Sequence, residues 1–150
     1  MAAFKKALLI ICKNLVSEKI RTIQLALKDI VESTNSETKS SLGDKHETAR
    51  AKMQFEREKV GKQLELIELQ MRELNRIDDT KISSIVGFGS VVETQTGLFF
   101  ISVPLGKIEF DQRTIFGISP SSPLAQELYR RKIGDSFVFN NIQYTILNIY

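Results

Sequence analysis

The 150-residue sequence contains no tryptophan, one cysteine and one histidine. The single cysteine, Cys12, cannot form an intramolecular disulfide, which favours a reducing compartment, and we expect a cytoplasmic protein. One cysteine and one histidine also exclude a zinc site built from these residue types. No stretch approaches the roughly 20 apolar residues of a membrane span. The apolar run at residues 7–12 is shorter than a signal peptide requires, and we interpret it as the start of a helix.

Proline and glycine are scarce in the first half of the chain. None of the three prolines and only two of the eight glycines, Gly43 and Gly61, lie within residues 1–77. Apolar residues recur there every three or four positions, in two stretches on either side of a polar segment at residues 33–43. The stretches are Phe4, Leu8, Ile11, Leu15, Val16, Ile20, Ile23, Leu27 and Ile30, and then Met53, Val60, Leu64, Ile67, Met71 and Leu74. This pattern predicts an antiparallel coiled-coil hairpin over residues 1–77, with its tip near residues 43–49.

Residues 80–150 have a different composition. They contain all three prolines, six of the eight glycines and seven of the nine phenylalanines. Runs rich in β-branched and aromatic residues predict strands at 82–94, 97–103, 107–110, 114–118, 136–139 and 142–150. One helix interrupts them, because Ser122 is a favoured N-cap, Pro123 fits the first helical position and Gly134 is a C-terminal stop. The predicted fold class is therefore α+β, a helical hairpin followed by a β domain with one short helix.

Two carboxylates lie at the predicted tip of the hairpin. Asp44 and Glu47 follow Gly43 at the start of the second apolar stretch. Asp is a favoured N-cap and Glu three residues later completes a capping box, which explains the pair structurally. The same pair suits Mg²⁺, which takes one or two protein carboxylates together with water and phosphate, so both interpretations stay open. His46 between them is expected to be an exposed first-turn residue or to position a water.

Three segments form an ordered set of motifs. Residues 43–49 read GDKHETA, residues 118–125 read ISPSSPLA and residues 132–138 read KIGDSFV. In this order they resemble the tip pattern G-D-x-x-E-x-A, the segment I-S-x-x-S-P-[IL]-A and the strand entry K-x-G-D-x-[VF]-x of the Gre family of bacterial transcript cleavage factors. The tip continues with Arg50 and Ala51, where the family has an acidic residue and a tyrosine.

The resemblance implies an FKBP-like fold for residues 80–150 and RNA polymerase as the partner, with Ser119, Ser122 and Pro123 as contact residues. It implies that the coil enters the polymerase secondary channel. There Asp44 and Glu47 would help to hold a shared Mg²⁺ and stimulate cleavage of backtracked transcripts. The partners would be the polymerase and the nascent RNA 3′ end, with DNA reached only indirectly. Such a protein is not an enzyme by itself, and stimulates the nuclease activity of the polymerase.

Basic residues are concentrated in the predicted hairpin, where residues 1–77 contain fifteen Lys and Arg against eleven Asp and Glu. Those of the second stretch nearest the tip are Lys45, Arg50, Lys52, Arg57 and Lys59. A solvated, ion-paired helix face is the simplest interpretation. The resemblance adds a second one, in which Lys45, Arg50 and Lys52 contact transcript phosphates.

Two other functions stay open. One is a non-catalytic, Gre-like regulator that occupies the secondary channel, and the intact pair Asp44 and Glu47 favours a cleavage factor over it. The other is an FKBP-like prolyl isomerase or chaperone with a coiled-coil handle. The absence of a tryptophan to floor an isomerase pocket disfavours that function, and we expect Phe99, Phe110 and Phe116 in the core. Fold alone does not decide between these functions.

Overall fold

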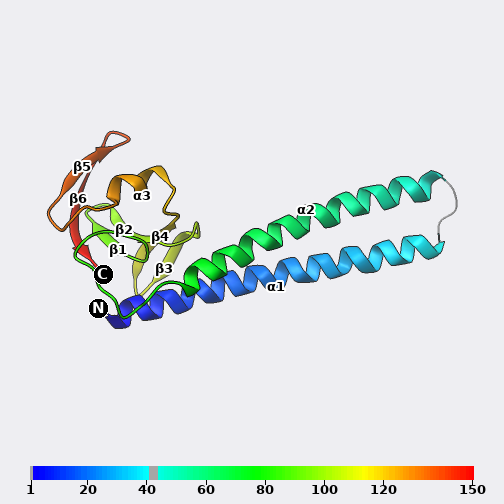
Figure 1. The fold of residues 1–150 in the computed structure, drawn as a ribbon, viewed down its shortest axis with the longest axis horizontal. Coiled ribbons are helices and arrows are strands. Elements are labelled where there is room, and N and C mark those ends of the chain that lie inside the picture. The colour runs from blue at the N-terminus through cyan, green and yellow to red at the C-terminus, as the bar shows by residue number, and fades with distance from the viewer. Residues whose placement is uncertain (1, 41–43) are drawn as a thin grey trace. The chain divides into compact units, whose positions relative to one another are not determined.

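The computed structural model describes residues 2–40 and 44–150, with side chains described for residues 2–33 and 47–150. Two long helices, α1 (Ala2–Ser40) and α2 (Asp44–Asn75), precede a six-stranded sheet with one short helix (Figure 1). The predicted α+β class is therefore confirmed. No helix of the described part of the chain is long and apolar enough to cross a membrane.

The chain divides into two compact units, which α1 and α2 both enter. Unit 1 consists of Met1–Lys13 together with Arg72–Tyr150, and unit 2 consists of Asn14–Met71. The first turns of α1 and the last turn of α2 thus belong to the unit that contains the sheet. The rest of the two helices forms unit 2.

Unit 2 is an antiparallel helix pair whose apolar stripe is only half-buried. Residues 29–33 of α1 share one surface depression with residues 49–56 of α2, and residues 15–23 of α1 share another with Ile67. Ile23, Ile30 and Met53 line these depressions and are half-buried, whereas among the predicted positions nearer unit 1 Val16 is buried and Leu15 is exposed. Two helices can exclude water from one seam alone, so the partial burial follows from the architecture.

Helix α1 is longer than the sequence predicts. We expected a polar loop over residues 33–43, but the backbone stays helical as far as Ser40. The Ser, Thr and Asn residues of this segment cost only a few tenths of a kcal/mol each in a helix, and Glu37 and Lys39 are good helix formers. An established helix propagates across such residues because each added residue contributes one hydrogen bond.

Unit 1 contains a mixed sheet with the strand order β3-β4-β2-β1-β6-β5. The strands are β1 (Val91–Thr94), β2 (Gly97–Ile101), β3 (Gly106–Phe110), β4 (Arg113–Ile118), β5 (Ser136–Phe139) and β6 (Ile142–Ile149). All neighbours pair antiparallel except β2 and β4, which are parallel. A crossover through β3 therefore separates β2 from β4, whereas short turns join β1 to β2 and β5 to β6.

Both faces of the sheet are covered. On one face, α3 (Pro123–Leu128) buries Ala125 and Leu128 completely. On the other face, the Phe4 ring of α1 lies 5.5 Å from the Phe110 ring and 6.2 Å from the Tyr150 ring, measured between centroids. Because successive side chains of a strand point to opposite faces of the sheet, neighbouring strand residues lie in two different apolar layers.

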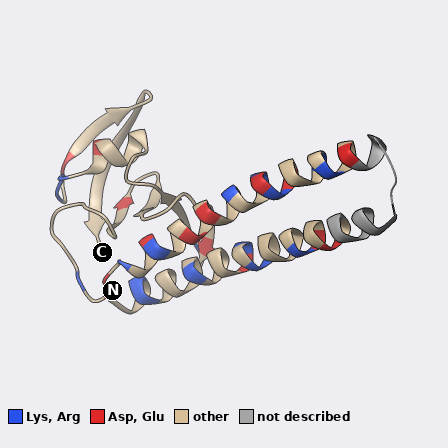
Figure 2. Ribbon diagram, turned by 45° about the vertical axis from the view of Figure 1, so that its right-hand side comes forward, with Lys and Arg blue, Asp and Glu red and all other residues tan. Residues whose placement is uncertain are grey.

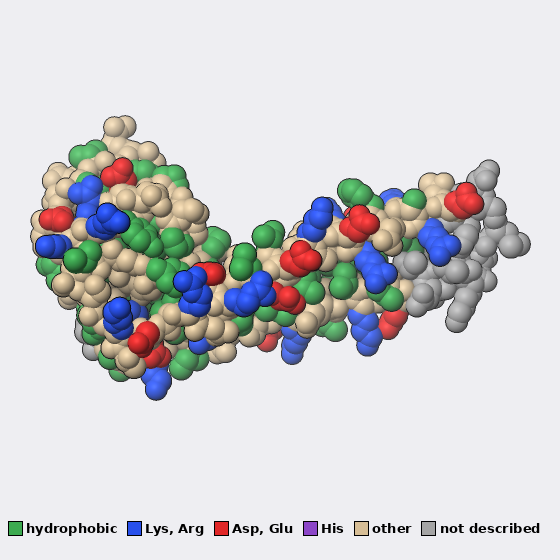
Figure 3. Space-filling view, viewed as in Figure 1, with side chains coloured by type: hydrophobic (Ala, Val, Ile, Leu, Met, Phe, Trp, Pro, Cys, Tyr) green, Lys and Arg blue, Asp and Glu red, His purple; other side chains and the backbone are tan. Residues whose placement is uncertain are grey.

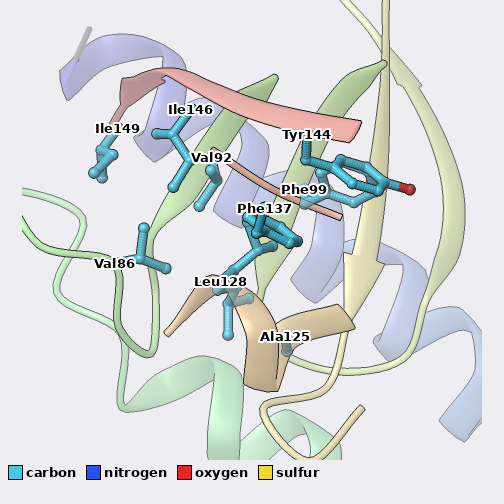
Figure 4. Close-up of a cluster of buried hydrophobic side chains, with 10 residues drawn as sticks. Val86, Val92, Phe99, Ala125, Leu128, Phe137, Tyr144, Ile146 and Ile149 are labelled. Carbon is cyan, nitrogen blue, oxygen red and sulfur yellow. The ribbon is translucent and has the colours of Figure 1, made fainter. Parts of the chain in front are cut away.

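The layer under α3 is the main hydrophobic cluster of unit 1. Figure 4 shows Leu128 and Ala125 of α3 directed at side chains from the sheet and from the segment before β1. Within it, the Phe137 and Tyr144 rings stack with centroids 5.3 Å apart. Phe99 is buried and Phe116 packs against the cluster, as expected for core residues.

Two sequence-based boundaries are wrong, and both depend on one tertiary contact. Residues 82–90 do not belong to β1; they make a single bridge, Ile85 with Lys132. Helix α3 ends at Leu128 rather than near Gly134, because Arg130 takes a left-handed conformation with φ of 65° and donates its N–H to the Val86 carbonyl. Gly134, with φ of 93°, instead forms the turn into β5.

Candidate functional site

The predicted tip residues begin helix α2. Asp44 is the first helical residue, so Asp44 and Glu47 occupy the first turn, three residues apart on one helix face. The side chain of Glu47 is exposed. The side chains of Asp44, Lys45 and His46 lie outside the described residues, so the capping box and the metal pair both stay predictions.

The basic residues that follow the tip are solvated. Arg50 and Lys52 are exposed, and among the described side chains neither takes part in an ion pair. Figure 2 and Figure 3 show charges of both signs distributed along the helices of unit 2. Arg50 and Lys52 are therefore solvated and form no ion pair with another described side chain.

A depression of ≈ 420 Å³ lies between the two helices close to this region. Its lining residues are Asp29, Ile30, Ser33, Ala49, Lys52, Met53 and Glu56. The small side chain of Ala49 stands where the other positions of the α2 stripe carry larger apolar residues, which leaves the space open. No sequence pattern predicted this feature, because it depends on which residues the two helices bring opposite each other.

The predicted partner residues Ser119, Ser122 and Pro123 are brought together in the turn from β4 into α3. The Ser122 Oγ accepts a hydrogen bond from the Ala125 N–H at 3.3 Å, so its predicted N-cap role is confirmed. The Ser122 N–H donates to the Ser119 carbonyl at 3.0 Å. Pro123 and Ser121 are exposed. The Ser122 oxygen is therefore used as the N-cap acceptor, whereas the side chains of Ser121 and Pro123 are accessible to solvent.

A cavity of ≈ 390 Å³ in unit 1 was not predicted. Its lining residues are Lys5, Arg76, Ile77, Asp78, Lys81, Ser83, Ile85, Gly87, Phe88, Gly89 and Ser90. Lys5 is only 4% exposed, although it carries a charge. The sequence contains a signal for this, since Lys5 lies three and four residues before the buried Leu8 and Leu9, on the buried face of α1.

The fold and these residues define a helical hairpin with an exposed acidic residue at the start of α2 and a separate β unit. No protein-family model and no curated protein matches the chain. A solved structure described as "Structure of the transcription factor Gfh1" is similar to 92% of this chain over 92% of its own length, with a TM-score of 0.36 and 16% identity.

Proposed function

We propose that the protein is a bacterial transcription elongation factor of the Gre type. In this proposal the protein is cytoplasmic, an FKBP-like domain at residues 80–150 binds RNA polymerase, and the hairpin enters the secondary channel of the enzyme. The observation that carries the proposal is that α2 begins at Asp44. The two carboxylates of the tip motif therefore occupy the first turn of a long helix, the position from which another molecule can be reached.

The donor set fits a shared Mg²⁺. Two carboxylates three residues apart on a helix supply hard oxygen ligands, and they are too few to hold the ion without ligands from a partner. When bound, Mg²⁺ activates water for hydrolysis of a phosphodiester. Asp44 and Glu47 would orient the ion from the protein's side. The exposed Arg50 and Lys52 would attract the phosphates of the nascent RNA 3′ end.

The docking half of the proposal rests on the turn before α3. Ser119 and Ser122 shape that turn through hydrogen bonds within the chain, and Pro123 is exposed on its surface. Proline at the first helical position holds the backbone without loss of a hydrogen bond. A rigid turn of this kind can present Pro123 to the polymerase with little entropy cost.

The test removes both negative charges and changes little else. In the double variant Asp44→Asn with Glu47→Gln the new side chains have the same size and still form hydrogen bonds in the first turn of α2. We expect it to fold and to bind polymerase, but to lose stimulated cleavage when added to backtracked complexes, as measured by sizing the RNA. The matched control is Glu65→Gln with Glu68→Gln, a pair with the same spacing further along α2. This control should stimulate cleavage by the polymerase as the wild type does.

The outcomes separate the three functions. Unchanged cleavage by the tip variant would refute the shared-metal role. Absence of cleavage with saturating wild-type protein, together with inhibited initiation, would identify a non-catalytic channel regulator. Acceleration of prolyl isomerisation in a peptide without any polymerase binding would instead identify an isomerase.

A further inference from the structure

The cavity in unit 1 contains an unusual lysine. Lys5 is 4% exposed, and its ammonium donates to the Lys81 carbonyl at 2.9 Å. That ammonium has three N–H groups, and no second acceptor for them occurs among the described residues. A buried charge without full hydrogen bonding is costly, so the remaining donors favour an acceptor in the cavity.

Asp78, which lines the cavity, and Glu73 make their direct hydrogen bonds to groups other than Lys5. The Asp78 Oδ1 accepts from the Thr80 hydroxyl at 2.6 Å and from the Thr80 N–H at 2.9 Å. Glu73 pairs with the Arg76 guanidinium at 2.9 Å. Neither carboxylate forms an ion pair with Lys5. Burial lowers the pKa of the Lys5 ammonium, and the charges of Asp78 and Asp79 raise it by a smaller amount through space. The Lys5 charge is therefore only partly compensated.

A second lysine and a serine line the same cavity. Lys81 is exposed at the cavity and, within the described part of the chain, belongs to no ion pair. Ser90 is 5% exposed; its Oγ accepts from the Gly87 N–H at 3.0 Å, and no described residue accepts its hydroxyl proton. Two lysines and one buried serine therefore line the same cavity with hydrogen-bond donors that no described residue accepts, against one lining carboxylate, that of Asp78.

The remaining walls of the cavity are apolar. Ile77, Ile85 and Phe88 line it, and the Arg76 guanidinium lies 5.6 Å from the Phe88 ring centroid. A volume of ≈ 390 Å³ is within the range of small-ligand sites and exceeds what a lone anion fills. The ligand class that matches is an oxyanion attached to an apolar or aromatic body.

We propose that this cavity binds a small phosphate monoester, with the Lys5 and Lys81 ammonium groups and the Ser90 hydroxyl on the phosphate and with Ile77, Ile85 and Phe88 against its organic part. A dianionic phosphate satisfies both cations at once, and the donors available match its oxygens. The site belongs wholly to unit 1, joining the first turns of α1 to the segment between α2 and β1 (Figure 1). It is independent of the polymerase.

Amide chemical shifts of the full-length protein, recorded at constant ionic strength, test the site. We expect saturable shifts of the Gly87, Gly89 and Ser90 amides with phenyl phosphate, and weaker binding of inorganic phosphate. The variants Lys5→Met and Lys81→Met should each weaken phenyl phosphate at least about tenfold. Lys107→Met, an exposed lysine of β3 that pairs with Glu109 at 3.1 Å, is the control and should bind as the wild type does.

Each result decides the proposal. Absence of saturable shifts in the wild type, or equal binding by Lys81→Met and the control, would overturn it. Lys81 is exposed, so this variant keeps the test valid even if Lys5→Met does not fold. Equal affinity for inorganic phosphate and phenyl phosphate would overturn the assignment to an ester, because the apolar walls would then contribute nothing.

Discussion

The two units bury their apolar residues to different extents. In unit 1 the side chains of Phe100, Ile115 and Leu128 are each 0% exposed, because layers of chain cover both faces of the sheet. In unit 2, Leu64 and Ile67 of the apolar stripe remain half-buried. A helix pair shares one seam with its partner and leaves the rest of each helix in water.

Because of this difference, most of the hydrophobic stabilisation and the proposed tip site belong to different units. Hydrophobic stabilisation is proportional to the apolar area removed from water, so most of it belongs to unit 1. The tip residues Asp44 and Glu47 begin α2 far along the sequence from that core and carry none of its packing. Substitutions at the tip should therefore change function at little cost in the free energy of unfolding.

The largest expected effect is from Phe100→Ala. Truncating a fully buried phenylalanine should cost about 3–5 kcal/mol in the free energy of unfolding. The matched change in unit 2, Leu64→Ala, should cost at most about 1.5 kcal/mol, because the leucine is only half-buried. Urea unfolding followed through resolved amide signals of each unit measures both values. Equal losses would contradict the unequal burial on which the comparison depends.

The next effect concerns Cys12, which α1 contributes to unit 1. It is 0% exposed, and burial raises the pKa of its thiol to about 12. Only the thiolate is nucleophilic, so Cys12 should react with Ellman's reagent at neutral pH at least about 100-fold more slowly in the folded protein than in urea.

A cysteine placed in unit 2, in place of the native one, completes this test. Leu27→Cys, in a background where Cys12→Val removes the native thiol, occupies a half-buried position of the same helix. It should react clearly faster than Cys12 under the same conditions. Similar rates would show that α1 is protected equally along its length.

A smaller effect is expected at the N-cap of α3. Ser122→Ala removes the Oγ that accepts from the Ala125 N–H and should destabilise unit 1 by about 1 kcal/mol. Ser122→Asp keeps an acceptor and should restore most of that loss. Urea midpoints measured on unit 1 signals check both variants, and the unit 2 signals should not move. Loss of stability in both variants alike would show that the hydroxyl acts through something other than the cap.

Local patterns predicted most of the fold. The strands β2 to β6 begin and end within two residues of their predicted bounds, because alternation and turn residues such as Asn140 and Asn141 act over short distances. The N-cap of α3 was readable for the same reason. Such signals depend on neighbours in the sequence alone.

The features that were missed depend on partners distant in sequence. Residues 82–90 contain strand-like residues, yet Ile85 finds only Lys132 to pair with, and Arg130 ends α3 because the Val86 carbonyl accepts its N–H. Lys5 lies on an apolar helix face, but only the fold supplies the Lys81 carbonyl and the cavity beside it. The acidic pair of the tip was predicted from sequence, and its chemistry stays a prediction that the cleavage assay tests.

The smallest effect has the opposite sign and belongs to unit 2. Gly61 is in the interior of α2, and a Cβ built there would meet no described atom within 4 Å. Replacing glycine by alanine within a helix removes backbone entropy from the unfolded chain, so Gly61→Ala should stabilise unit 2 by about 0.5–1 kcal/mol.

The comparison change is Gly117→Ala in unit 1, where the new Cβ would lie 3.0 Å from the Leu105 Cβ and 3.1 Å from the Val103 carbonyl oxygen. That variant should destabilise, since a packed core tolerates overfilling poorly. Urea midpoints that move in opposite directions for the two variants would support loose packing in the helix pair and dense packing in the β unit, and a loss of stability in Gly61→Ala would contradict it.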